Sequence, residues 1–405
     1  MSLIFRLDSQ LSRCPKHRFV AHVQLFLVTA SVDQTTRIHA PWSDESDVWH
    51  EIARPQIHGY DISCLTMLSS YKFASGAEEK VVRIFKSTLT FKTCLDKISY
   101  ADDFGEELVE GASLPALGLM NKAIFGQDLK GNKPHIGSLN DLTYDRPPVE
   151  EELIQHTLWS EEQKLYGHGY EIFTMAAKHD GTLLATVCKS TNSKYAAILI
   201  WDTKTWMQVQ QLISHQLTVT QLAFSPDDKY LVSVSRDRQW SLFGLNERRY
   251  NLLATSLKKD NLHNRIIWCC AWTHDSKYFA TGSRDGKIGI WSENVSLSQL
   301  LLPTAILEIK DSSVTALSFA PIMLSANAYI LAVGFDSGEI EIFNVVLQNN
   351  QAVWESLAKY DSSFAHHLTV KRLQFRPQSK SEKKMLYLAS CGSDHTVKIY
   401  NIDVS

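Results

Sequence analysis

The sequence predicts an all-β fold, a β-propeller of seven blades whose first blade is incomplete. Similar segments begin at positions 168, 215, 263 and 310, which are 47 or 48 residues apart and close to the ~40–45 residues of a propeller blade. Within each segment, short runs of Val, Ile, Leu and aromatic residues alternate with polar turns such as SPDDK, THDSK and SRDG, a pattern typical of strands. Apolar residues make up 44% of the 405 residues, which is enough for a large buried core.

The repeats follow one another along the chain. A partial unit at 26–40 supplies the second and third strands of a blade, and full units begin at 58, 168, 215, 263, 310 and 366. Six full units and one fragment give seven blades in a single domain that spans residues 25–405. Residues 1–24 form an atypical N-terminal segment. The first blade is therefore predicted to lack its innermost strand, unless the segment SLIFRL at 2–7 substitutes for it.

A long insertion at about 87–166 separates the unit at 58 from the unit at 168. It carries a strand-like stretch at 113–126, a candidate for the outer edge of a blade, and then a Gly, Asn, Asp and Pro-rich stretch at 126–148 that is typical of a long loop. Leu153, Ile154, Leu158 and Leu165 follow with loose helical spacing. We interpret this last stretch as a solvated connector between blades, with a short helix that docks a partner as the alternative.

Polar residues recur at fixed places in the apolar repeats. A His opens a unit, a Ser or Thr lies in its second strand, and an acid follows four residues later in a tight turn, where a carboxylate can accept backbone N–H groups. An aromatic residue closes the third strand. The complete set is His263, Thr281, Asp285 and Trp291, and two sets in which Phe243 or Tyr400 replaces Trp are His215, Ser233 and Asp237, and His366, Ser390 and Asp394.

Such His, Ser and Asp sets also resemble hydrolase triads. An enzyme needs one triad, however, and these sets recur with the repeat, which favours a structural role. The sequence contains no GxxxxGK[ST], HExxH or GxSxG motif and no GxGxxG after a strand. Its seven cysteines form no CxxC pair, which argues against a zinc site and a disulfide framework. We therefore predict no catalysis, cofactor, metal or small-molecule substrate.

Four arginines lie beside the turn acids. The 41 basic and 44 acidic residues nearly cancel, so a basic site has to be local. Equivalent positions of consecutive blades fall on one rim of a propeller, and we predict a single basic patch there that suits RNA phosphates or an acidic partner. Alternatively, each arginine pairs with a neighbouring acid and only keeps the face soluble. The four are Arg236, Arg238, Arg265 and Arg284.

Membrane association is not expected. No stretch approaches the ~20 apolar residues that span a bilayer, and charged residues interrupt the apolar N-terminus, which makes a poor signal peptide. We expect a soluble chain in the cytoplasm and nucleus.

The recurring His, Ser or Thr, Asp and Trp resemble the network of WD-repeat proteins, and longer phrases resemble a narrower family. DQTTRIHAPW at 33–42, WHEIARPQIHGYD at 49–61, LWSEEQKLYGHGYEIF at 158–173, SRDRQWSLF at 235–243 and CGSDHTVKI at 391–399 are similar to the second subunit of the Elongator complex, in its C-terminal propeller only. Propeller folding does not require phrases such as PQIHGYD, so they are the more specific signal.

The resemblance implies a non-catalytic scaffold. Members of this family have two propellers and join the large first subunit to the catalytic third subunit in a complex that modifies wobble uridines of transfer RNA. A weak contact with transfer RNA through the arginine patch is the alternative function. The chain departs from the family by lacking the first propeller and in residues 1–24.

Overall fold

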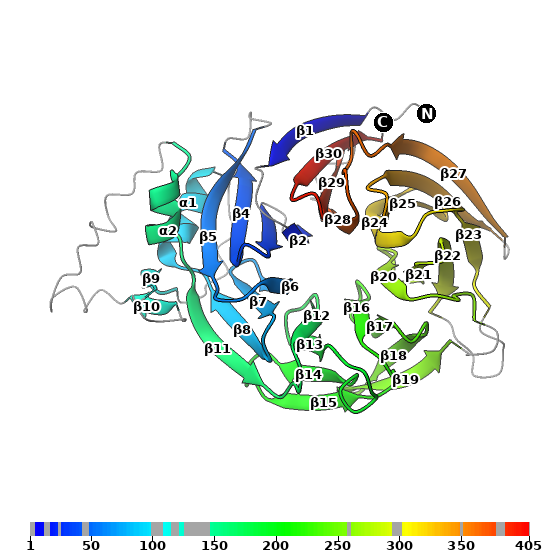
Figure 1. Cartoon of the computed structure of the whole chain (residues 1–405), viewed down its shortest axis with the longest axis horizontal. Helices are drawn as coiled ribbons and strands as arrows, with labels where there is room; N and C mark the ends of the chain where they lie inside the picture. Colours follow the sequence, from blue (N-terminus) through cyan, green and yellow to red (C-terminus); the bar gives the residue numbers. More distant parts are fainter. Residues whose placement is uncertain are drawn as a thin grey trace.

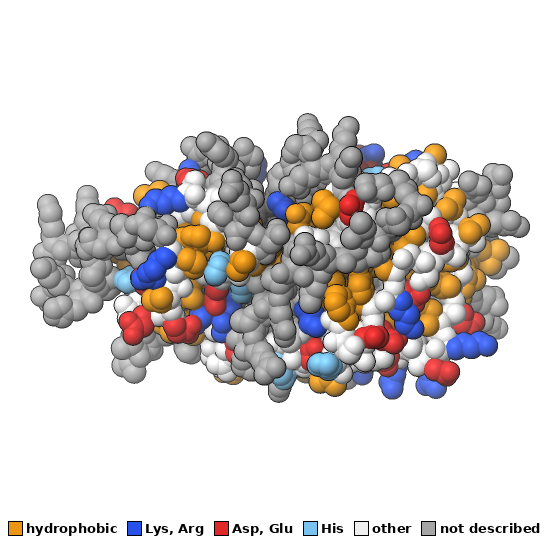
Figure 2. All heavy atoms as spheres, turned by 90° about the horizontal axis from the view of Figure 1, so that it is seen from above, with side chains coloured by type: hydrophobic (Ala, Val, Ile, Leu, Met, Phe, Trp, Pro, Cys, Tyr) orange, Lys and Arg blue, Asp and Glu red, His pale blue; other side chains and the backbone are white. Residues whose placement is uncertain are grey.

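The computed structural model describes residues 5–11, 17–22, 26–42, 48–98, 108–114, 121–124, 146–256, 261–293, 302–348, 351–377 and 385–404. Seven four-stranded antiparallel sheets stand around a central axis (Figure 1). Seen edge-on, the ring is a flat disc (Figure 2). The predicted seven-bladed propeller is therefore confirmed.

Strands of a blade follow one another outward from the axis, and the first strand of each blade contacts the first strand of the next blade. Blade 1 consists of β2 (His17–His22), β3 (Leu27–Ser31), β4 (Thr35–Pro41) and β5 (Trp49–Ile57). Blade 2 consists of β6 (Ile62–Ser69), β7 (Lys72–Ala77), β8 (Val81–Lys86) and β11 (Ser160–Tyr166). Blade 3 consists of β12 (Ile172–Ala177), β13 (Leu183–Cys188), β14 (Ile198–Asp202) and β15 (Gln208–Leu212).

The remaining four blades repeat this order. Blade 4 consists of β16 (Val219–Phe224), β17 (Tyr230–Ser235), β18 (Trp240–Asn246) and β19 (Arg249–Thr255). Blade 5 consists of β20 (Ile267–Trp272), β21 (Tyr278–Ser283), β22 (Lys287–Ser292) and β23 (Ala305–Glu308). Blade 6 consists of β24 (Val314–Ser325), β25 (Ala328–Phe335), β26 (Ile340–Gln348) and β27 (Gln351–Tyr360). Blade 7 consists of β28 (Val370–Phe375), β29 (Met385–Gly392), β30 (Val397–Asp403) and β1 (Phe5–Leu11).

The core lies between adjacent blades. Second and third strands are covered on both faces, which is why their sequences are nearly continuous apolar runs. Between blades 4 and 5, the Trp240 ring lies 4.8 Å from Trp291 and 5.2 Å from Phe279. The outer strand β15 is mostly exposed and reads Gln-Val-Gln-Gln-Leu. In blades 3 to 5, burial is therefore greatest in the second and third strands and lowest in the outer strand.

The expectation of an incomplete first blade is wrong. Strand β2 pairs antiparallel with β3 in the register Val20↔Thr29 and is the missing innermost strand. An innermost strand pairs with only one neighbouring strand, so six residues are enough to complete the blade. The weak apolar pattern of these six residues does not predict a strand. The segment SLIFRL does not substitute for it. Its residues from Phe5 onward belong to β1, which pairs with β30 and closes the ring as the outer strand of blade 7 (Figure 1).

The insertion forms a module on the outside of blades 1 and 2 (Figure 1). It contains α1 (Leu89–Ile98), the two-stranded sheet of β9 (Gly111–Ser113) and β10 (Lys122–Ile124), and α2 (Glu150–His156). Phe91 of α1 packs 5.1 Å from the Trp159 ring and 5.8 Å from the Phe26 ring. Strand β11 is the outer edge of blade 2, and the described residues 122–124 of the stretch 113–126 belong instead to β10, which pairs with β9. Most of the loop predicted at 126–148 lies outside the described residues.

The stretch interpreted as a connector does contain a helix. Only Leu153 and Ile154 of its four apolar residues lie in α2, and Leu153 is buried. The Thr157 hydroxyl accepts the Arg54 N–H of β5 at 2.8 Å. The helix is thus fixed to blade 1 of its own chain, and neither the solvated connector nor a free docking helix describes it fully.

Candidate functional site

Blade 5 assembles the predicted complete set of polar residues. His263 Nε2 lies 2.8 Å from the Thr281 hydroxyl, and Trp291 Nε1 donates to the same hydroxyl at 2.9 Å. Asp285 lies 3.7 Å from His263 Nδ1 and accepts the backbone N–H of Asn264 at 2.7 Å. The acid therefore ties the loop that enters the blade to the turn between its second and third strands.

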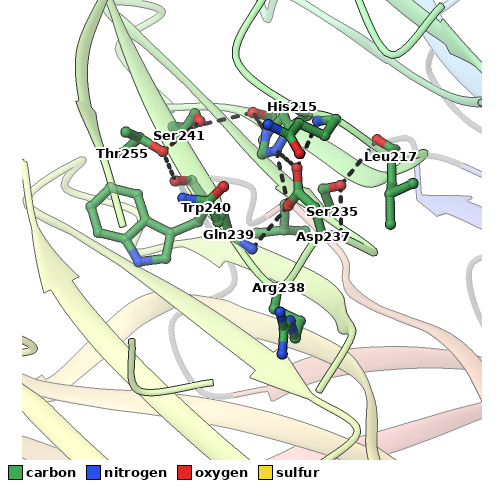
Figure 3. Close-up of polar contacts among 12 residues, drawn as sticks. His215, Leu217, Ser235, Asp237, Arg238, Gln239, Trp240, Ser241 and Thr255 are labelled. Atoms are coloured by element: carbon green, nitrogen blue, oxygen red, sulfur yellow. Dashed lines mark hydrogen bonds and ion pairs between the residues drawn. The ribbon is translucent and has the colours of Figure 1, made fainter. Parts of the chain in front are cut away.

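Blade 4 has the same arrangement without the indole donor, because Phe243 replaces Trp. His215 Nε2 lies 2.8 Å from the Ser233 hydroxyl, and His215 Nδ1 lies 3.1 Å from Asp237 (Figure 3). Asp237 also accepts the N–H groups of Gln216 at 2.9 Å and of Gln239 at 3.0 Å. These contacts of the carboxylate all come from groups of its own blade.

Blade 7 repeats the contacts with a tyrosine. His366 lies 2.6 Å from the Ser390 hydroxyl through Nε2 and 2.9 Å from Asp394 through Nδ1. The Ser390 hydroxyl is 3.5 Å from that of Tyr400, so the residue that replaces Trp in this set still offers a polar neighbour. Burial alone would raise the pKa of Asp394, but hydrogen bonds from His366 and from the His367 backbone hold this pKa well below its usual range.

Blades 4 and 7 thus contain a Ser–His–Asp sequence of hydrogen bonds like that of a hydrolase. Facing a carboxylate, His Nδ1 carries the proton, and Nε2 is then free to accept from serine. Ser233, Ser390 and both histidines are almost wholly buried, however. A nucleophile has to reach its substrate, so these sets support the turns and offer no accessible hydroxyl.

A fourth network was missed at the sequence level. His168 Nε2 lies 2.8 Å from the Thr186 hydroxyl, which also accepts Trp201 Nε1 at 2.7 Å. Burial lowers the pKa of His168 to about 4, so its imidazole is neutral at physiological pH. The separation of 18 residues between His168 and Thr186 equals that of the histidine pairs in blades 4 and 5. That spacing was the available signal.

Blade 2 departs from the pattern. His58 does not bond to Ser75; it accepts the Tyr60 N–H at Nδ1 and faces Glu79 at 3.0 Å through Nε2. Arg83 contacts the same carboxylate at 2.6 Å. Burial would raise the pKa of Glu79, but the hydrogen bonds from His58 and Arg83 lower it to about 2. A buried ion cluster therefore replaces the hydroxyl network in this blade.

Blade 1 carries a chain of ion pairs that leads to the insertion. Arg37 contacts Asp33 at 3.1 Å and Glu51 at 3.0 Å. Arg54 contacts Glu51 at 2.9 Å and Glu150 of α2 at 2.6 Å. Nothing in the repeat pattern indicates this connection, because the two ends are more than a hundred residues apart.

All four rim arginines are exposed. Arg236 and Arg238 lie in the turn between β17 and β18, Arg284 lies in the turn between β21 and β22, and Arg265 precedes β20. In Figure 3 the Arg238 side chain extends away from the His215–Asp237 contacts. Within the described part of the chain, none of the four forms an ion pair. The alternative that each arginine pairs with a neighbouring acid is therefore not supported in the described residues. All four arginines lie on one face of the ring.

The described residues contain no group of three or more His, Cys, Asp or Glu side chains placed to hold a metal ion. None of their helices is long and apolar enough to cross a membrane.

Comparisons with known proteins agree with this architecture. The WD40 family (WD domain, G-beta repeat) matches residues 206–243, 255–292 and 359–401. The chain is 46% identical to "Elongator complex protein 2" of Drosophila melanogaster over 95% of this chain and 50% of the relative. It is 43% identical to the Rattus norvegicus protein of that name (93% and 51%) and 36% identical to that of Arabidopsis thaliana (97% and 52%). The chain spans about half the length of the curated relatives it matches.

Proposed function

Because this chain is homologous along nearly its whole length to about half of Elongator complex protein 2, we propose that it is a non-catalytic scaffold of the Elongator complex. In this proposal the propeller holds the large first subunit and the catalytic third subunit together, and the assembly modifies wobble uridines of transfer RNA in the cytoplasm and nucleus. One observation carries the scaffold role: the polar sets that resemble catalytic groups are buried and bonded within their own blades.

A rigid ring suits such a role. Side-chain hydrogen bonds tie the entering loop of blades 4, 5 and 7 to the turn on the same face, which keeps those surface loops in fixed positions. Binding residues are commonly carried by loops on a rigid scaffold. The rims and the insertion module are therefore the surfaces that we propose for partner contacts.

Co-purification tests the proposal. The tagged chain is expected to recover the first and third subunits at stoichiometric yield. A folded chain recovered without either subunit would overturn it. A variant with all four rim arginines replaced by Gln is the matched comparison: loss of the subunits in this variant assigns the rim to assembly, and full recovery leaves the rim to a separate ligand.

A second candidate function is the binding of RNA or an acidic partner through the arginine rim. Four exposed guanidinium groups without described ion pairs favour it, since guanidinium binds phosphate and carboxylate in bidentate fashion. Charge reversal of Arg236, Arg238, Arg265 and Arg284 is expected to abolish retention on heparin. Four phosphate contacts would also give a salt dependence with a slope of roughly −3. Unchanged retention after reversal would exclude this function.

A further inference from the structure

A tyrosine platform continues the arginine rim over blades 2 and 3. Tyr60 and Tyr170 occupy equivalent places, two residues after His58 and His168. They are 52% and 41% exposed. Their backbones precede β6 and β12, so both rings stand on the face that carries the rim arginines. Packing does not account for two exposed rings at the same position of adjacent blades.

Basic side chains lie against Tyr170 and its neighbour Tyr195. The Lys80 ammonium lies 5.9 Å from the centre of the Tyr170 ring, which meets Tyr195 edge-on at 5.0 Å. The Lys194 ammonium lies 5.4 Å from the centre of the Tyr195 ring. Both lysines are exposed. Blades 2 and 3 therefore present aromatic faces and positive charges side by side.

The platform is continuous with the arginine rim through backbone contacts. Ser190, in the loop that carries Tyr195, bonds to the Thr218 hydroxyl at 2.8 Å. Thr218 in turn accepts the backbone N–H of Arg236 at 3.0 Å. The next link is from the Asn261 amide to the Arg238 carbonyl, in the loop that leads to Arg265. The Ile172 N–H donates to the Glu79 carbonyl at 2.9 Å and joins blade 2 to blade 3, so these basic and aromatic side chains lie on adjacent loops of blades 2 to 5, which we call the arc.

Exposed acids lie at both ends of this arc. Asp311 and Asp336 are exposed in blade 6, in the loop before β24 and the turn after β25, and Glu78 is exposed in the turn of blade 2, two residues before Lys80. A polyanion is repelled by the acids of blade 6, which limits the arc on that side. The limit follows from the placement of charges and is independent of the tyrosines.

We propose that this arc binds single-stranded nucleic acid, with unpaired bases stacked on Tyr60 and Tyr170 and the phosphates along the arginine rim. The inference rests on the second candidate function and names its ligand class. Phosphates alone would need only the cations, whereas exposed aromatic rings beside cations are the usual combination for unpaired bases. An acidic peptide uses the arginines but has no bases to stack, and a duplex hides its base faces.

Titration of labelled oligonucleotides with the full chain tests this inference. The probes are a single-stranded RNA of mixed sequence, its DNA counterpart, the same RNA as a duplex, and polyglutamate. Tyr60→Ala and Tyr170→Ala should each weaken binding of the single strands by about fivefold or more. Tyr→Phe at either position should restore it, because the ring is kept. Met207→Ala is the matched control, since Met207 is 66% exposed on the opposite face of blade 3.

The outcomes separate this inference from the function on which it rests. Loss of single-strand affinity in the alanine variants, with duplex and polyglutamate binding unchanged, supports it. Equal binding by wild type and alanine variants, with loss only after arginine reversal, overturns the tyrosine platform and leaves the rim to an acidic partner. Absence of binding to every probe overturns both. A preference for RNA over DNA identifies contacts to the 2′-hydroxyl.

Discussion

The turn of Arg238 offers a substitution that removes charge and is expected to leave the fold intact. Arg238 has a φ of +72°, in the left-handed region that costs a non-glycine residue about 1–2 kcal/mol. Glycine occupies the corresponding turns of blades 5 and 6, where Gly286 and Gly338 have φ values of +79° and +91°. Replacing Arg238 by Gly relieves this strain but increases the entropy of the unfolded chain, at about 0.5–1 kcal/mol. The net effect on the free energy of unfolding should lie between zero and about +1.5 kcal/mol.

Replacing the neighbouring arginine, Arg236, is expected to change the free energy of unfolding in the opposite direction. Arg236 is exposed in the same turn, and its φ is not positive. Arg236→Gly removes the same charge but gains nothing from the backbone, so it should lower the free energy of unfolding by about 0.4–1 kcal/mol. Both variants keep the backbone bonds that hold the turn, from Arg236 to Thr218 and from Arg238 to Ser235.

Equilibrium urea unfolding measures the change in the free energy of unfolding, and heparin retention at different salt concentrations measures the effect of the lost charge. Both variants should lose about 0.7–0.9 from the slope of log affinity against log salt if each arginine contacts one phosphate. Destabilisation of Arg238→Gly by more than about 1 kcal/mol would refute the argument, because the side chain would then stabilise the turn. A shift of the same sign in both variants would refute it as well.

Three further predictions concern stability. Glu51→Gln, which breaks contacts with two arginines, should cost about 2–3 kcal/mol in urea unfolding, whereas Glu150→Gln should cost under about 1 kcal/mol because that carboxylate is largely exposed; equal costs would contradict the ion-pair chain. Trp291→Phe should cost about 1 kcal/mol through loss of one indole hydrogen bond, and a cost no larger than that of an exposed control would remove the network from the stability of blade 5. Burial, with nearby arginines, lowers the pKa of His39 to about 3, and burial lowers that of His168 to about 4. The unfolded chain therefore binds more protons than the folded chain below about pH 6.5. The free energy of unfolding should fall by up to ~1.4 kcal/mol per pH unit for each histidine as the pH is lowered to about 4. His168→Asn should flatten this slope, and an unchanged slope would count against the assignment.

Repetition explains which parts of the site were predictable. The sets of blades 4, 5 and 7 were found because the same residue types recur at the same place in each unit. The shared rim of the arginines followed from the same argument, since equivalent positions of blades point to one face. Blade 2 was not predictable, because Glu79 and Arg83 together draw His58 away from Ser75. Composition alone does not reveal which of two partners a buried histidine selects.

The repeat pattern did not predict contacts between distant segments, for a different reason. The pairing of β2 with β3 and of β1 with β30 depends on strand edges that the rest of the ring leaves open, and it requires little from the sequence of either strand. The attachment of α2 depends on Arg54, which is buried against groups from two parts of the chain. Local propensity carries no information on such tertiary partners.

The same turns combine a fixed interior with a variable exterior. In blades 4 and 5 the inward-facing residue of the turn is an aspartate that binds backbone N–H groups, and it has the same task in both. The outward-facing residue at the positive-φ position is Arg238 in one and Gly286 in the other. The backbone geometry of this position favours glycine, so the stability of the turn does not explain the presence of arginine there. Gln34 and His395 occupy the same position in blades 1 and 7, with φ values of +69° and +67°, so the blades tolerate side chains there, and the binding role of Arg238 stays a proposal that has to be tested together with the strain of its backbone.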